Sequence, residues 1–205
     1  MANSTWSGPV RSENGFQSIT KNATTGAITT SFNVNSTGFV AAPSNIMAVE
    51  AGAGMSATSV YKTSVTSEGG IITTKIMIDL TGVTSSGTTN DIIGVDNSSP
   101  AYIGSLTTAN NGTIFSARLL TLETPATGDT DIDIYEADEA TGVYSTAISS
   151  LTETSLLNSG GVAAGDIDIL TTPTAGKYLY MVQGGSTTGV YTAGKFILEV
   201  LGATA

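Results

Sequence analysis

The residues with the clearest capacity for chemistry in this sequence are the closely spaced carboxylates of the segment TGDTDIDIYEADEATG. Within it, Asp131 and Asp133 alternate with isoleucines, so in a β-strand the carboxylates project from one face and the isoleucines from the other. Two carboxylates on one face suit a hard cation such as Ca²⁺, but the glycine and terminal glutamate of an EF-hand loop are absent. We expect a solvated acidic strand face, with a cation site at Asp131 and Asp133 as the alternative. The same expectation applies to Asp166 and Asp168 in GDIDIL.

The absence of two residue types limits the catalytic mechanisms that this chain could use. The sequence has no cysteine and no histidine, which removes thiolate catalysis, zinc-thiolate sites and the Ser-His-Asp arrangement. A glycosidase-type carboxylate pair or a Ser-Lys pair remains, but we find neither in a recognisable context. We therefore expect no enzymatic activity and no cofactor.

Aromatic residues gather near the end of the chain, at Tyr178, Tyr180, Tyr191 and Phe196. Alternating tyrosines on a strand could stack on sugar rings, as in a carbohydrate-binding module. The same residues equally suit the core of a β-protein or a subunit interface, and we expect one of these two roles.

The charge and hydropathy of the chain limit its partners. The formal net charge is −10 and only seven residues are lysine or arginine, whereas phosphate backbones require a clustered basic face. No apolar run approaches the roughly 18 residues of a membrane span, and the N-terminus lacks the apolar region of a secretory leader. We therefore expect no nucleic acid partner, no membrane insertion and synthesis inside the cell.

The distribution of apolar residues predicts an all-β protein. SATSVYKTSVTSEGGIITTKIMIDLTG indicates a hairpin, in which one strand ends near Thr66, SEGG forms the turn and Ile71 to Leu80 returns. Further strands are expected in DIIGV, AYIGS, GTIFSARLLTLET bounded by Pro125, TDIDIYEA, LTETSLL, KYLYMVQG and GKFILEVLG. Many short strands separated by turns favour an antiparallel β-sandwich that is jelly-roll-like.

The domain organisation follows a change in composition. Residues 1–45 are rich in Asn, Ser, Thr and Gly and have irregularly spaced apolar residues, which indicates an extended N-terminal arm with short β-segments. The turn residues Pro43 and Asn45 precede denser apolar sequence. We therefore place the β-sandwich body at residues 46–205.

Three segments carry a resemblance to a known class of proteins: WSGPVRSENGF, TGDTDIDIYEADEATGVY and the closing AGKYLYMVQGG with YTAGKFILEVLG. Together they resemble small virion structural proteins of marine tailed bacteriophages that decorate the outer face of the capsid. The resemblance implies a cement or decoration protein, often trimeric, that is made in the host cytoplasm and binds the major capsid protein on the virion surface. A phage fibre or host-surface adhesin that binds carbohydrate is the alternative function.

The N-terminal arm contains the residues that we expect to contact the capsid: Trp6, Pro9, Val10, Arg11 and Phe16. A large amphipathic ring in an otherwise polar segment gains most by burial in a partner's pocket, where Trp and Arg commonly dominate the binding energy. The alternative is that Trp6 packs back on its own sandwich and has a structural role.

Overall fold

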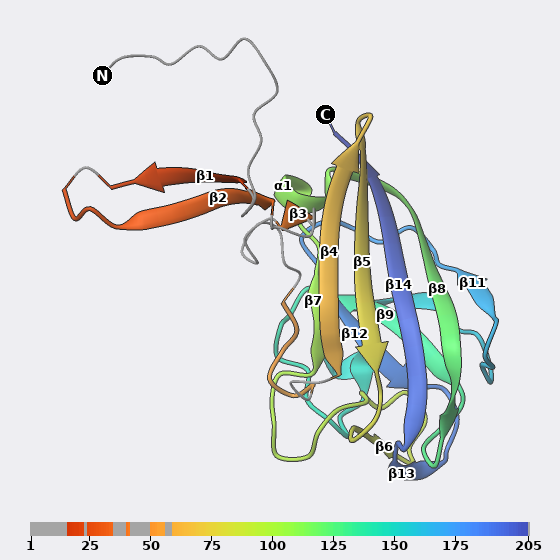
Figure 1. The fold of residues 1–205 in the computed structure, drawn as a ribbon. Helices are drawn as coiled ribbons and strands as arrows, with labels where there is room; N and C mark the ends of the chain where they lie inside the picture. Colours follow the sequence, from red (N-terminus) through yellow and green to blue (C-terminus); the bar gives the residue numbers. More distant parts are fainter. Residues whose placement is uncertain (1–15, 23, 35–39, 42–49, 56–58, 205) are drawn as a thin grey trace, which may run out of the picture. The chain divides into compact units, whose positions relative to one another are not determined.

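The computed structural model describes residues 16–22, 24–34, 40–41, 50–55 and 59–204 (Figure 1). The chain forms two compact units, Met1–Met47 and Ala48–Ala205. The arm-to-body boundary expected at residue 45 falls in the segment 42–49, outside the described residues.

The described part of the first unit is a small antiparallel sheet in the order β1-β2-β3. It consists of β1 (Phe16–Lys21), β2 (Ile28–Val34) and β3 (Val40–Ala41). In the loop between β1 and β2, the side-chain oxygen of Asn22 accepts hydrogen bonds from the backbone N–H groups of Thr24 and Thr25, both at 2.9 Å. Such local side-chain hydrogen bonds favour a turn over a continued strand, so the chain reverses its direction here.

The second unit is built almost entirely of β-strands. Its elements are β4 (Val60–Glu68), β5 (Ile71–Asp79), β6 (Thr84–Ser86), β7 (Tyr102–Ser105), α1 (Thr108–Asn111), β8 (Thr113–Ala126), β9 (Ile132–Ala137), the 3-10 helix η1 (Ile148–Ser150), β10 (Glu153–Leu157), β11 (Ile167–Ile169), β12 (Tyr178–Gln183), β13 (Thr188–Val190) and β14 (Ala193–Ala203). No helix among the described residues is long and apolar enough to cross a membrane.

Two antiparallel sheets make up the sandwich, a five-stranded sheet in the order β11-β8-β14-β5-β4 and a four-stranded sheet in the order β10-β9-β12-β7. Along the chain, β5, β7, β8, β9, β10, β11, β12 and β14 alternate between the sheets, except that β9 and β10 are neighbours in the same sheet. This strand order is that of an eight-stranded jelly roll, with β4 added at one edge and β6 and β13 as a separate pair (Figure 1). The expected all-β jelly-roll sandwich is confirmed.

The core lies between the two sheets and follows the period of two that a strand imposes. Ile76 and Ile78 of β5 and Phe196 and Leu198 of β14 are all fully buried, whereas Met77 and Ile197 between them are partly exposed. The four-stranded sheet contributes fully buried residues such as Met181. Each such aliphatic or aromatic side chain stabilises the fold by about 1.5–3 kcal/mol through its burial.

The hairpin of β4 and β5 turns at Gly69 and Gly70, as the segment SEGG predicts. Both glycines have positive φ angles, 58° and 84°, which is the backbone conformation of a type I′ turn and is costly for residues with a Cβ. The first strand runs to Glu68 rather than ending near Thr66. The tight turn therefore extends the pairing to the end of both strands.

Two strand boundaries differ from the expectations. β8 continues through Pro125 to Ala126, because Pro125 lies at a register shift between β8 and β14, where its missing N–H interrupts no regular ladder. The segment DIIGV forms only isolated bridges, from Asp91 to Ala147, from Ile92 to Val182 and from Gly94 to Thr84. Its backbone pairs with the end of β12, because the N–H of Ile93 donates to the carbonyl of Met181 and the N–H of Gln183 donates to that of Asp91, but it forms no continuous strand.

Candidate functional site

The acidic strand face that the sequence predicts is buried in the structure. β9 lies between β10 and β12, and all six of its residues are buried, with Asp133 0 % exposed. The backbone N–H of Ser159 donates to Asp133 Oδ1 at 3.1 Å, and the Ser159 hydroxyl donates to the carbonyl of Ile132 at 3.1 Å. The expectation of a solvated face was wrong for Asp133, because the loop after β10 folds over this part of the strand.

Burial changes the proton affinity of this carboxyl group. It raises the pKa of Asp133 to about 6; the Ser159 amide opposes the rise, and the negative charges of Asp131 and Asp129 add to it. Burial and the charge of Asp129 likewise raise the pKa of Asp131. Asp131 Oδ1 and Asp133 Oδ2 are buried without a hydrogen-bond partner. This strand therefore carries carboxyl groups that are costly to ionise.

The cation site considered for Asp131 and Asp133 has no third carboxylate, histidine or cysteine ligand in the part of the chain that the structure describes. No group of three or more His, Cys, Asp or Glu side chains that could hold a metal ion occurs among these residues. The Asp131 carboxyl group packs directly against Gly184, where an added Cβ would lie 2.5 Å from its Cγ. Asp131 and Asp133 are thus two carboxylates on one side of the chain, without a third acidic ligand beside them.

Asp129 has a structural role that the sequence did not reveal. It is 3 % exposed, its Oδ1 accepts from the backbone N–H of Asp131 at 2.9 Å, and its Oδ2 accepts from that of Thr187 at 2.8 Å. The hydroxyl of Tyr191 donates to its backbone carbonyl at 2.9 Å. Asp129 therefore joins the loop before β9 to the segment that leads into β13.

The second acidic segment, around β11, is oriented opposite to the expectation. Asp168 is half-buried, with its Oδ2 buried and without a hydrogen-bond partner, whereas Ile167 and Ile169 are 57 % and 70 % exposed. Asp166 holds the preceding turn, because its Oδ2 accepts from the backbone N–H of Ala163 at 2.7 Å. The apolar residues of this edge strand thus face outwards.

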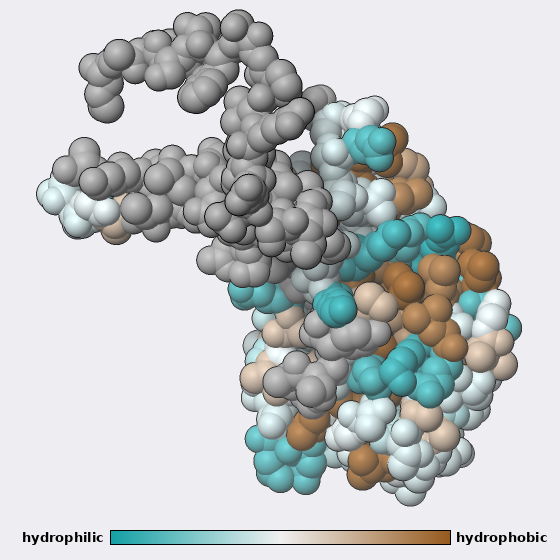
Figure 2. Space-filling view, viewed as in Figure 1, coloured by the Kyte–Doolittle hydropathy of each residue, from teal (hydrophilic) through white to brown (hydrophobic). Residues whose placement is uncertain are grey.

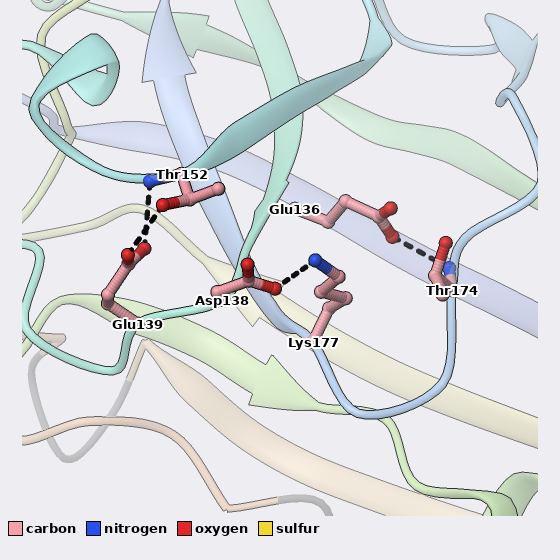
Figure 3. Close-up of polar contacts among 6 residues, drawn as sticks. All are labelled: Glu136, Asp138, Glu139, Thr152, Thr174 and Lys177. Carbon is pink, nitrogen blue, oxygen red and sulfur yellow. Dashed lines mark hydrogen bonds and ion pairs between the residues drawn. The ribbon is translucent and has the colours of Figure 1, made fainter.

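Three further carboxylates at the end of β9 brace neighbouring loops (Figure 3). Glu136 Oε2 accepts from the backbone N–H of Thr174 at 2.7 Å, and Asp138 forms an ion pair with Lys177. Glu139 accepts from both the N–H and the hydroxyl of Thr152, at 2.8 and 2.7 Å, and these bonds lower the pKa of its carboxyl group. Each of these carboxylates binds a residue of a neighbouring loop. The cluster therefore holds these loops against the sandwich and has a structural role.

The tyrosines considered as a sugar-stacking platform are mostly core residues. Tyr180 and Tyr191 are 0 % and 1 % exposed, and the ring of Tyr102 lies 5.1 Å from that of Tyr178 and 6.4 Å from that of Tyr180. The Tyr180 hydroxyl donates to the carbonyl of Glu139 at 2.7 Å and accepts from the N–H of Gly142 at 3.2 Å. Burial raises the pKa of Tyr180 to about 12, so the ring packs in the interior and its hydroxyl anchors a covering loop.

We expect Tyr180→Phe to lower the free energy of unfolding by about 1.5 kcal/mol, because it leaves the Gly142 amide and the Glu139 carbonyl without their buried partner. Urea denaturation of the purified protein measures this change. Tyr178→Phe is the matched control, because no hydroxyl hydrogen bond of Tyr178 occurs among the described residues, and it should change the stability by less than about 0.5 kcal/mol. Equal effects of the two substitutions would contradict the anchoring role of the Tyr180 hydroxyl.

The residues expected to contact a partner lie at the N-terminal end of the chain. Trp6, Pro9, Val10 and Arg11 fall outside the described residues. Phe16 is the first residue of β1, where its backbone is paired with that of Val34. Their role as a binding element therefore remains a prediction.

Comparison with protein-family models, with curated proteins and with solved structures finds no match to this chain.

Proposed function

We propose that this chain is a non-enzymatic virion structural protein that binds the outer surface of a phage major capsid protein lattice and stabilises the shell. The observation that carries the proposal is the division of the chain into a jelly-roll body and a separate small N-terminal unit. The N-terminal unit contains the only tryptophan of the sequence. A rigid body with a distinct binding segment suits a protein that sits on a repeating surface.

The structure of the body supports a scaffolding role. Jelly-roll sandwiches recur in viral capsid and lectin domains, which supports the proposal by analogy of fold. The carboxylates at the end of β9 hold loops in place: Glu136 binds a backbone amide, Glu139 binds Thr152, and Asp138 pairs with Lys177. These contacts favour a stable particle component over a reactive centre.

In this proposal the N-terminal segment is the element that contacts the capsid, and three copies assemble on the lattice. Trp6 fills a pocket of the major capsid protein, Arg11 pairs with a carboxylate at the rim, and Pro9, Val10 and Phe16 complete the contact. The carbohydrate-binding adhesin is less well supported, because Tyr180 and Tyr191 are buried and are not available to stack on a sugar ring.

We expect Trp6→Ala to weaken binding to empty shells, purified from the encoding phage without this protein, by more than about tenfold, since tryptophan is a frequent hot-spot residue. Co-sedimentation measures the binding, and thermal melting measures the stability of the same variant. Thr25→Ala, a change in the exposed turn between β1 and β2, is the control. Unchanged binding combined with a lowered melting temperature would mean that Trp6 is structural and that the proposed contact is wrong.

A further inference from the structure

The outer surface of the five-stranded sheet carries a continuous apolar row. The strand register places Ile167 opposite Leu120, Leu120 opposite Ile197, and Ile197 opposite Met77. Leu120, Ile197 and Met77 point away from the core, because their neighbours along the strands are the inward-facing core residues Leu119, Leu198, Ile76 and Ile78, and Ile167 is 57 % exposed. Figure 2 shows apolar surface between two hydrophilic bands on this side of the molecule.

On one side of the apolar row lies a row of three charges centred on Glu199. Glu199 Oε1 accepts from Arg118 Nε at 2.8 Å and lies 2.7 Å from Arg118 Nη2, and Glu199 Oε2 lies 3.6 Å from Lys75 Nζ. From β5 through β14 to β8, the signs of this Glu199 row are plus, minus, plus.

On the other side lies a row with the opposite signs, centred on Lys195. Lys195 Nζ lies 2.7 Å from Glu123 Oε2 and 3.7 Å from Asp79 Oδ2. From β5 through β14 to β8, the signs of this Lys195 row are minus, plus, minus. We call the apolar row together with the Glu199 and Lys195 rows the striped face.

Each of the strands β5, β14 and β8 therefore carries one positive and one negative charge, and the two lie on opposite sides of the apolar row. The pairs are Lys75 and Asp79 on β5, Glu199 and Lys195 on β14, and Arg118 and Glu123 on β8. We propose that the striped face is an interface between two copies of this chain, related by a two-fold axis that runs along the apolar row.

Rotation about this axis leaves each strand at its place along the row and exchanges the two charged rows. Lys75 then faces the partner's Asp79, Glu199 faces the partner's Lys195, and Arg118 faces the partner's Glu123. An isologous contact repeats each of these pairs twice. Each of the six charges in the two rows thus gains an opposite charge across the interface, while the apolar rows pack against each other. Lys62 of β4, which is exposed and paired with Met77, lies on the axis beyond the end of the apolar row and faces the partner's Lys62, so the contact is centred on β5, β14 and β8.

The charges also select this axis over the other in-plane axis. A two-fold axis along β14 would place each charged row over itself, with Glu199 facing the partner's Glu199 and Lys75 facing the partner's Arg118. Like charges that face each other across an interface are strongly disfavoured. The arrangement of signs therefore specifies the orientation of the two copies as well as the contact.

The size of the sheet is close to what such a contact needs. Four of its five strands have nine or more residues, and the sheet covers roughly 20 by 30 Å, which approaches the ~800 Å² that each partner buries in a standard interface. Packed sheets lie about 10 Å apart with their strands within about 30° of each other. At that angle, a charge two residues from the axis is shifted sideways from its facing partner by less than the spacing between neighbouring strands. The two charges of each facing pair therefore remain close enough to attract each other.

The two-fold contact is independent of the proposed capsid function, because it uses only the body and requires no shell. It is also compatible with trimers on a lattice, where an isologous contact joins neighbouring trimers. Failure of capsid binding and failure of self-association are therefore separately observable.

Two single substitutions and their mixture test the interface. Lys75→Glu places glutamate opposite the partner's Asp79, and Asp79→Lys places lysine opposite the partner's Lys75, so each variant repels its own copy at both symmetric positions. In the mixed dimer every facing pair is again of opposite sign. We expect each variant to dimerise at least tenfold more weakly than the unaltered chain, and a one-to-one mixture to recover most of the affinity.

Sedimentation velocity over a concentration series measures the association of the chain, and circular dichroism verifies that each variant is folded. Asp96→Lys, which changes an exposed loop outside the striped face, should leave the association unchanged. Arg118→Glu and Glu123→Lys form a second complementary pair, should either β5 variant fail to fold. The proposal is overturned if the unaltered chain is monomeric at high concentration, or if the mixtures associate no better than the single variants.

Discussion

Gly202→Ala is expected to lower the free energy of unfolding of the body by about 4 kcal/mol, more than the roughly 1–3 kcal/mol that overpacking usually costs, because the clash is with backbone. Gly202 lies in β14, between β5 and β8. A Cβ on this residue would lie 1.8 Å from the backbone oxygen of Asn111, so the backbone of one segment must move. Urea denaturation with tryptophan-independent detection, such as far-ultraviolet circular dichroism, measures the loss.

The segment at Asn111 has little freedom to relieve this clash. Asn111 is buried, its side-chain amide donates to Thr74 Oγ1 at 2.6 Å, and its side-chain oxygen accepts from the N–H of Thr107 at 2.7 Å. Gly161→Ala is the matched control, because the nearest atom to its added Cβ is Thr130 Oγ1 at 3.5 Å. A loss of less than 1 kcal/mol for Gly202→Ala would show that the two backbones do not approach so closely.

Asp133→Asn is expected to stabilise the protein by about 2 kcal/mol more at pH 7.5 than at pH 4, from roughly 1.4 kcal/mol for each unit of pKa shift. Burial holds the pKa of Asp133 at about 6, above the ordinary value of 3.8. The folded state therefore binds the proton more tightly than the unfolded state does. As the pH rises from about 4 to 6, the unfolded state loses its proton first and the stability falls; above pH 6 the penalty is constant.

Asparagine at this position carries no charge at any of these pH values. Its side-chain oxygen can still accept from the Ser159 amide, as Asp133 Oδ1 does. Its NH₂ group replaces Oδ2, which has no partner, and the cost of burying it is the same at both pH values, so the difference between the two measurements isolates the carboxylate. Thermal melts of the variant and of the unaltered chain at pH 4 and pH 7.5 test this prediction. If the variant differs in stability from the unaltered chain by the same amount at both pH values, Asp133 ionises without penalty.

Much of the body could be predicted from local sequence. The alternating isoleucines of β5 and the SEGG turn predict a hairpin because a strand has a period of two and glycine tolerates positive φ. The turn lies at Gly69 and Gly70, as expected. The apolar segments that became β7, β8, β9, β10, β12 and β14 were likewise recognisable, because a strand that packs in a core must present apolar side chains to it.

The environment of the acidic residues could not be predicted in this way. Alternation indicates that Asp131 and Asp133 share a face of β9, but it does not tell whether that face is open to solvent. The loop at Ser159, which lies far along the chain from β9, covers it and leaves Asp133 buried. At β11 the same alternation again places an aspartate, Asp168, partly out of solvent, but here the isoleucine Ile167 is exposed, whereas the isoleucines of β9 are buried.

The amino-acid sequence by itself determined the strand class, most strand positions, the tight β4–β5 turn and the absence of histidine and cysteine chemistry, because these depend on residue types and on neighbours along the chain. Only the tertiary structure decided which carboxylates are buried, that Tyr180 and Tyr191 belong to the core, and that six charges from β5, β8 and β14 form two rows of opposite sign. Those properties depend on which strands become neighbours. In a jelly roll the neighbours are mostly strands distant in sequence, such as β5 and β14, so no local pattern records them.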